Sequence, residues 1–163
     1  MIDAETRALA ERVLAACRAR KWTLATAESC TGGLVAGALT EIAGSSDVVD
    51  RGFVTYSDAA KMALLGVPEA TLIAHGAVSR QTAEAMARGA LARSDVGLTV
   101  AITGIAGPGG GSAEKPVGLV HFAAAAKDGR LIHREKRYGD VGRSEVRRLS
   151  VIEALNLLLE LAS

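Results

Sequence analysis

Aromatic side chains are scarce in this chain of 163 residues, at only 3% of the sequence. Proteins that bind single-stranded nucleic acid without sequence preference stack the bases on aromatic rings, so the scarcity argues against that class. Basic and acidic residues are nearly balanced, at 19 and 18, which gives a formal net charge of +1. A charge this small provides no electrostatic footprint for DNA, RNA or an anionic membrane. We therefore expect neither a nucleic acid nor a membrane as a partner.

Long apolar runs and cysteine frameworks are missing as well. No apolar stretch approaches the ~20 residues that a membrane-spanning helix needs, and no signal peptide precedes the first predicted helix, so we expect a cytoplasmic protein. The two cysteines, Cys17 and Cys30, are too few for a disulfide framework. The three histidines are scattered along the chain without an HExxH or CxxC companion. We therefore expect no metal site.

Helix and strand patterns alternate along the chain, and apolar residues make up 49% of it. Apolar periodicity and capping signals predict helices over 3–20, 31–43, 59–65, a stretch after Ser79, and 144–161. Alternating or β-branched runs predict strands over 22–27, 48–56, 96–103, 118–125 and 131–138, the last two joined by a two-residue turn at Asp128-Gly129. This order predicts an α/β fold: a three-layer α/β/α sandwich whose mixed, mostly parallel sheet contains one antiparallel hairpin. We expect residues 1–163 to form a single domain.

A hydroxyl and a thiol lie where the first strand gives way to a helix. The segment Ala27–Gly33 reads Ala-Glu-Ser-Cys-Thr-Gly-Gly and places Ser29 and Cys30 at the predicted helix N-terminus. Unpaired N–H groups and the helix dipole favour negative charge there, which suits an anionic ligand or a nucleophile whose attack creates an oxyanion. The alternative is structural: Ser29 or Thr31 caps the helix, and the glycines let it pack closely.

A second loop, over 103–112, is rich in glycine. Five glycines fall between Gly104 and Gly111, but the pattern fits neither a Walker A motif nor a dinucleotide fingerprint. Glycine frees the backbone to approach a ligand and offer its N–H groups. Ligands of open α/β sheets bind beyond the carboxyl ends of strands, so the loops after Ala27 and Ile102 can share one crevice. The alternative is a flexible connection.

Tyr56 and Lys61 are the next candidates for chemistry. Lys61 lies among apolar residues of a short predicted helix, and burial would lower its pKa by disfavouring the charged form. To act as a base near neutral pH, that pKa must fall from about 10.4 to roughly 7–8. The alternative is a surface lysine that buries only its stem. Neither SxxK nor GxSxG occurs at Ser29, so residue spacing alone supports a nucleophilic serine only weakly.

Taken together, three blocks of sequence resemble the CinA C-terminal-domain family. They are Ala27–Gly33, Tyr56 with Lys61, and Thr103–Pro108 continuing through Glu114–Gly118. The resemblance extends over nearly the whole chain and implies a nicotinamide mononucleotide (NMN) deamidase. Such enzymes hydrolyse the carboxamide of NMN to a carboxylate and ammonia in pyridine-nucleotide salvage, with no metal or cofactor. Some relatives carry an additional N-terminal molybdopterin-binding-like domain, and we expect a stand-alone version here.

The resemblance also implies roles for individual residues. Ser29 would be the nucleophile, Lys61 its general base, and Tyr56 would assist the proton relay or orient the lysine. The implied substrate-binding residues are Cys30, Thr31, Gly32, Thr103, Gly104, Gly107 and Arg143. Backbone N–H groups near Cys30 and Thr31 would hold the oxyanion, and either Thr31 or Arg143 would bind the 5′-phosphate. The spacing between Gly139-Asp140 and Arg143 is longer than the family pattern leads us to expect, which leaves the phosphate ligand open.

Two other functions remain open at this point. One is a non-catalytic nucleotide-binding or regulatory module that kept the pocket and lost turnover. The other is an amidase or esterase of the same mechanism that acts on another small molecule. The apolar helix faces also make a homodimer or a higher homo-oligomer an expectation.

Overall fold

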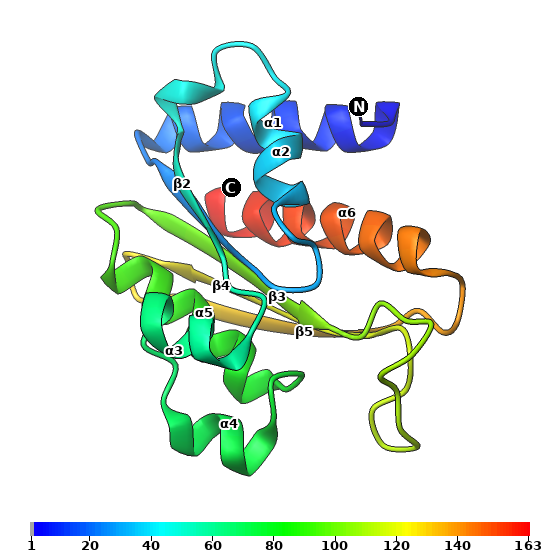
Figure 1. The fold of residues 1–163 in the computed structure, drawn as a ribbon. Helices are drawn as coiled ribbons and strands as arrows, with labels where there is room; N and C mark the ends of the chain where they lie inside the picture. The colour runs from blue at the N-terminus through cyan, green and yellow to red at the C-terminus, as the bar shows by residue number, and fades with distance from the viewer. Residues whose placement is uncertain (1) are drawn as a thin grey trace.

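A five-stranded sheet forms the centre of the computed structural model, which describes residues 2–163 (Figure 1). In spatial order its strands are β2 (Val49–Val54), β1 (Leu24–Glu28), β3 (Leu98–Gly104), β4 (Leu119–Ala126) and β5 (Leu131–Arg137). β1 pairs parallel with β2 and β3, and β4 pairs antiparallel with β3 and β5. All strands except β4 therefore run in one direction, which confirms the predicted mixed, mostly parallel sheet with one antiparallel hairpin.

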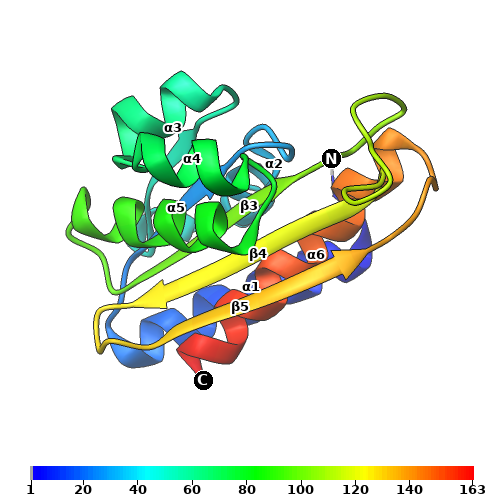
Figure 2. The same cartoon turned by 90° about the horizontal axis from the view of Figure 1, so that it is seen from below.

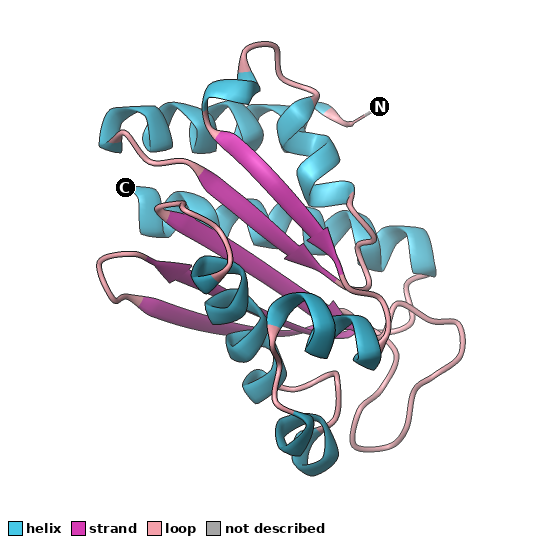
Figure 3. Cartoon of the chain, turned by 60° about the vertical axis from the view of Figure 1, so that its left-hand side comes forward, coloured by secondary structure: helices cyan, strands magenta, loops and turns pink. Residues whose placement is uncertain are grey.

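Helices cover both faces of this sheet, so it is the middle layer of three (Figures 1 and 3). One face carries α1 (Ala4–Arg20), α2 (Leu34–Thr40) and α6 (Arg143–Ala162). The other face carries α5 (Arg80–Ala92), with α3 (Asp58–Leu65) and α4 (Glu69–His75) packed beside it (Figure 2). A 3₁₀ turn at Ser45–Asp47 leads into β2. Within residues 2–163, no helix combines the length and apolarity that crossing a membrane requires.

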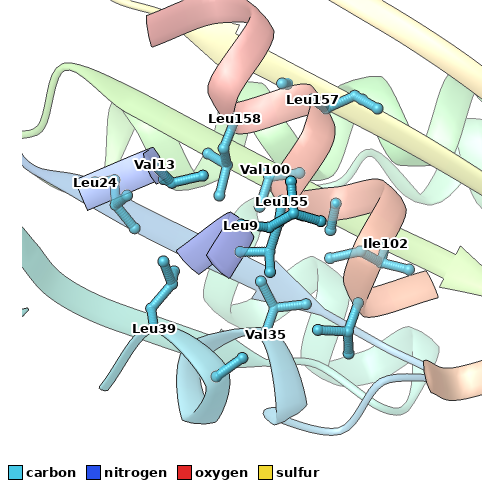
Figure 4. Close-up of a cluster of buried hydrophobic side chains, with 14 of the residues drawn as sticks. Leu9, Val13, Leu24, Val35, Leu39, Val100, Ile102, Leu155, Leu157 and Leu158 are labelled. Carbon is cyan, nitrogen blue, oxygen red and sulfur yellow. The ribbon is translucent and has the colours of Figure 1, made fainter. Parts of the chain in front are cut away.

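The two faces of the sheet differ in side-chain size. On β3, Val100 and Ile102 join the core beneath α1 and α6, whereas Ala101 faces α5. On β4, Phe122 likewise joins the core beneath α1 and α6, and Ala123 faces α5. Figure 4 shows the larger core around Leu9, Val13, Leu24, Val35, Leu39, Val100, Ile102, Leu155, Leu157 and Leu158. Burying each such side chain contributes roughly 1.5–3 kcal/mol, so this core fixes the strand ends from which the candidate site projects.

Helix α3 begins and ends where local signals predict. The Ser57 side chain accepts a hydrogen bond from the Ala60 N–H (3.0 Å) and caps the first turn. Gly66 ends the helix with a φ of 64°, a left-handed conformation that glycine adopts without strain. Between these two residues, Lys61 points inward and is almost completely buried.

The hairpin turn differs from its prediction. The connection between β4 and β5 spans residues 127–130 rather than two residues, and the Gly129 N–H donates to the Ala126 carbonyl (3.0 Å). A two-residue Asp-Gly turn requires positive φ at both positions, but only Gly129 has one, at 96°. Asp128 instead accepts a hydrogen bond from the Arg130 N–H (3.2 Å), which stabilises the longer turn.

Candidate active site

A cavity of about 290 Å³ opens at the carboxyl ends of β1 and β3. Its walls come from five segments of the chain: the loop after β1, Tyr56 together with Lys61 of α3, residues 77–78 before α5, the end of β3 with the glycine loop, and the start of α6. The side chains and backbone that line it include Ser29, Cys30, Tyr56, Lys61, Thr103, Gly104, Gly107 and Arg143. This confirms the prediction that the loops after Ala27 and Ile102 share one crevice.

Ser29 directly follows the last residue of β1, and its backbone is bonded on both sides. Its N–H donates to the Ile102 carbonyl on β3 (2.9 Å). The carbonyl of the same peptide group, from Glu28, accepts from the Thr55 N–H beyond β2 (2.8 Å). The peptide group between Glu28 and Ser29 is therefore hydrogen-bonded to two neighbouring chain segments, which fixes the backbone of the nucleophile candidate as a preorganised site requires.

Lys61 reaches Ser29 from the opposite wall of the cavity. Its Nζ lies 2.9 Å from Ser29 Oγ and donates to the Thr55 carbonyl at 2.8 Å. The side chain is only 1% exposed, which rules out the surface lysine. Burial lowers the pKa of the Lys61 ammonium, while the nearby Asp58 carboxylate works in the other direction. No salt bridge within residues 2–163 includes this amine, so its neutral form can accept the Ser29 proton.

Cys30 is the neighbour of Ser29 in the cavity lining and carries a buried thiol. Burial raises the pKa of the Cys30 thiol to about 12, so it stays protonated at neutral pH and is a poor nucleophile. Cys30 lines the cavity, and none of the hydrogen bonds within residues 2–163 uses its backbone N–H as a donor to another residue. This N–H is therefore available to a negatively charged oxygen beside Ser29.

Thr31 and Gly32 lie outside the cavity lining, although both were predicted as substrate-binding residues. Thr31 is completely buried, and its hydroxyl has no hydrogen-bond partner in the described part of the chain. Gly32 is exposed and has a φ of 57°. Its N–H donates back to the Ser29 carbonyl (3.0 Å) and so shapes the turn rather than the cavity wall.

Helix α2 begins at Leu34 rather than at residue 31, and its N-terminus is already occupied. The buried Glu28 carboxylate accepts hydrogen bonds from the N–H groups of Val35 (2.8 Å) and Ala36 (3.0 Å). Gly33 is at the N-cap position and has no side chain with which to cap the helix. The helix end therefore neutralises an internal carboxylate, and two predictions are wrong: the helix N–H groups do not face a ligand, and Ser29 and Thr31 do not cap the helix.

Tyr56 and Arg143 meet at the rim of the cavity. The Tyr56 side chain is 61% exposed, and its hydroxyl accepts a hydrogen bond from Arg143 Nη2 (2.9 Å). Arg143 Nη1 donates to the Gly107 carbonyl (2.9 Å), and no salt bridge within residues 2–163 includes Arg143. Tyr56 is thus bonded to the arginine rather than to Lys61. Of the residues that line the cavity, two are basic, Lys61 and Arg143, and none is acidic.

The glycine loop is an ordered wall rather than a flexible connection. The buried hydroxyl of Thr103 donates to the Ala77 carbonyl (2.8 Å), which ties the end of β3 to the segment before α5. Gly104 is required by packing, because a Cβ there would lie 2.7 Å from Val120 Cγ2. Gly107 adopts a φ of 83° and turns its carbonyl toward Arg143. Together these contacts hold the loop against the cavity.

Two charged residues near the site were assigned no role from the sequence. Arg147 donates to the carbonyls of Cys30 (Nε, 3.1 Å) and Thr31 (Nη2, 3.4 Å), and Glu28 holds the start of α2. A carboxylate at the end of a buried strand and a second arginine four residues after Arg143 are the signals that could have identified them. Within residues 2–163, no group of three or more His, Cys, Asp or Glu side chains is placed to hold a metal ion.

Comparisons with known proteins identify the family of this chain. A family model described as "CinA C-terminal domain" matches residues 6–162. Nicotinamide-nucleotide amidohydrolase PncC of Enterobacter agglomerans is 49% identical over 98% of this chain and 96% of that protein. A CinA-like protein of Synechococcus sp. (strain RCC307) is 54% identical over 95% of this chain, which spans only 37% of that protein's length. The crystal structure of competence/damage inducible protein CihA from Agrobacterium tumefaciens superposes with a TM-score of 0.98 at 57% identity, over 100% of this chain and 99% of that one.

Proposed function

This chain belongs to the CinA C-terminal domain family, and we propose on that basis that it hydrolyses the carboxamide of nicotinamide mononucleotide to a carboxylate, releasing ammonia. Amidohydrolase activity is supported by the PncC relatives, which match nearly full length at about half identity. The observation that carries the mechanism is the 2.9 Å contact between the buried Lys61 amine and the Ser29 hydroxyl. The product, nicotinic acid mononucleotide, would return to pyridine-nucleotide salvage.

In the first half of the proposed reaction, Ser29 Oγ attacks the carboxamide carbon while the neutral Lys61 amine takes the hydroxyl proton. Negative charge develops on the carboxamide oxygen, where the Cys30 N–H can donate. The C–N bond then breaks, and the Lys61 ammonium returns its proton to the departing nitrogen. Ammonia leaves, and the acyl group remains as an ester on Ser29.

In the second half, water replaces ammonia at the same centre. Lys61, neutral again, takes a proton from water as the water oxygen attacks the ester carbon. The ester C–O bond breaks, the proton passes to Ser29 Oγ, and the carboxylate product leaves. The Thr55 carbonyl holds the amine in place through both halves, because it accepts a hydrogen bond from Lys61 (2.8 Å) that leaves the serine side of the amine available.

Arg143 is our candidate for the 5′-phosphate. The cavity lining contains two basic residues and no acidic one, a charge pattern suited to an anionic substrate. Lys61 contacts Ser29. The Arg143 guanidinium lies at the rim of the cavity and donates hydrogen bonds to two neutral acceptors, the Gly107 carbonyl and the Tyr56 hydroxyl. Thr31, the other candidate, is buried away from the cavity.

The proposal is tested by incubating the purified protein with NMN and following ammonia and nicotinic acid mononucleotide together. We expect one carboxylate product for each ammonia released. Absence of release, with NMN still raising the melting temperature, would instead support the non-catalytic binding module. Turnover of other amides or esters with NMN untouched would support an amidase or esterase of the same mechanism on a different substrate.

A further inference from the structure

We propose that Arg147 is a positioning residue that strengthens the oxyanion donor of this site without touching the substrate. Its charge would act through the peptide groups of the nucleophile loop, defined here as residues 29–33. This inference rests on the proposed function, since it concerns the oxyanion formed when Ser29 attacks. Arg147 itself does not line the cavity.

The contacts of Arg147 direct its charge at this loop. Arg147 lies about one helical turn after Arg143 near the start of α6, and it contacts the nucleophile loop whereas Arg143 contacts Gly107 and Tyr56. Its Nε and Nη2 donate to the carbonyls of Cys30 (3.1 Å) and Thr31 (3.4 Å). No salt bridge within residues 2–163 includes Arg147, so these two carbonyls are the acceptors that its guanidinium contacts.

A chain of peptide groups leads from these carbonyls to the cavity. The Thr31 carbonyl belongs to the same peptide as the Gly32 N–H, which donates to the Ser29 carbonyl (3.0 Å). The Ser29 carbonyl in turn belongs to the same peptide as the Cys30 N–H, the donor left unused at the cavity. Hydrogen bonds in series polarise one another. A cation at the start of this chain therefore makes the Cys30 N–H a stronger donor.

Two further features favour this arrangement. Gly32 has a φ of 57°, a left-handed conformation that favours glycine, and this turn directs its N–H to the Ser29 carbonyl. On the other side of the loop, the Glu28 carboxylate holds the N–H groups of Val35 and Ala36. Glu28 thus joins the two segments that flank the loop, and Arg147 binds two carbonyls within it, so the peptide dipoles are held in place before the reaction begins.

The test compares R147Q and R147K with the wild type, with R148Q as the matched control. Arg148 is the next residue of α6, but it pairs with Glu145 and Asp3 and does not contact the loop. We expect R147Q to lower kcat for NMN about tenfold to a hundredfold, less than the loss of an oxyanion donor itself, with KM close to the wild-type value. R147K should recover part of kcat because it restores the charge, and R148Q should match the wild type.

A second assay compares the reactivity of Ser29 in the same variants without using NMN. A fluorophosphonate reacts with Ser29 by forming an Oγ–P bond and expelling fluoride, and negative charge develops on its phosphoryl oxygen. A wild type that is labelled at Ser29 but does not turn over NMN would contradict the proposed function alone. Slower labelling of R147Q, partly restored in R147K, would still support the role of Arg147.

Wild-type kcat and labelling in R147Q would overturn the inference, as would a loss confined to KM or an equal loss in R148Q. Melting temperatures are recorded for every variant. If R147Q is unfolded at the assay temperature, R147K decides the question. A severalfold loss of kcat at unchanged KM supports the inference, and unchanged kcat with altered KM overturns it.

Discussion

Burial acts in opposite directions on two neighbouring groups of the site. Burial disfavours the charged form of each group. It therefore lowers the pKa of Lys61, whose charged form is the protonated amine, and raises the pKa of Cys30 to about 12, because its charged form is the deprotonated thiolate. Both groups therefore favour their neutral forms. A neutral amine next to a serine hydroxyl can act as a base, whereas a neutral thiol is a poor nucleophile, and this favours Ser29 over Cys30 as the nucleophile that we propose.

Lys61 gives the reaction a predictable pH dependence. Because the proposed mechanism requires the neutral amine, kcat/KM for NMN should rise with pH through an ionisation whose pKa lies below the ~10.4 of an ordinary lysine. The measurement is kcat/KM from about pH 6 to about pH 10, with K61M and the exposed-lysine control K127M. K61M should lose activity across the range, and K127M should keep the profile. A rate that falls as pH rises, or that is indifferent to K61M, would show that another group is the base.

Arg143 should affect binding more than the chemical step, because a phosphate lies away from the bond that breaks. R143A is expected to raise KM for NMN by about tenfold to a hundredfold with a smaller effect on kcat. Nicotinamide riboside, which lacks the phosphate, should show little difference between R143A and the wild type. R137A is the matched control, since Arg137 pairs with Glu135 and does not line the cavity. An unchanged KM for NMN would assign the phosphate to another residue.

At the scale of elements, local signals were readable from the sequence and non-local ones were not. Helix α3 lies within one residue of its predicted range, 59–65, because its two caps, Ser57 and Gly66, each act within the adjacent turn. The start of α2 was misplaced because its cap is the Glu28 carboxylate, seven residues before the Val35 N–H that it accepts. Helix α4 was missed: it is seven residues long, begins after Pro68 without a side-chain cap, and buries only Leu72.

The site could be predicted residue by residue only through the family resemblance. Ser29 and Lys61 are 32 residues apart, and no spacing rule links them. The parallel pairing of β1 with β2, in which Glu28 lies opposite Val54, brings the two following segments together. Contacts of this kind depend on strand order, which periodicity does not specify.

Glu28 offers a test of how an element supports the site. Val35 and Ala36 donate to different oxygens of Glu28. In E28Q, the NH₂ group therefore faces one of these two N–H donors and leaves it without an acceptor, and the charge at the helix N-terminus is lost. We expect the free energy of unfolding to fall by about 1–3 kcal/mol, with kcat reduced because the nucleophile loop loosens. Urea denaturation measures the first effect, with E69Q, in the exposed first turn of α4, as the control. Equal stability of E28Q and the wild type would contradict this role.

At the scale of the whole molecule, net charge and site charge give different information. The chain is close to neutral, at +1, which argues against a polyanionic partner. The cavity nevertheless has two basic lining residues and no acidic one. Composition could therefore exclude broad classes of partner, but only the fold reveals an environment suited to a small anion.

The buried amine of Lys61 should also make the free energy of unfolding depend on pH. Because the folded-state pKa of Lys61 is lowered, protonation favours the unfolded chain. The destabilisation is full below the folded-state pKa and disappears as pH rises toward ~10.4. The unfolding free energy of the wild type should therefore rise relative to K61M over that window, by at most ~1.4 kcal/mol per pH unit. Urea denaturation of both proteins across the window measures this slope, and parallel curves would contradict a lowered pKa.

The most direct test of the whole account is ammonia release from NMN by the wild type and by S29A in the same assay. We predict that the wild type turns NMN over and that S29A lowers kcat by about a thousandfold or more. NMN should still raise the melting temperature of S29A, because the cavity and Arg143 are intact. Turnover by S29A at the wild-type rate would contradict the serine mechanism.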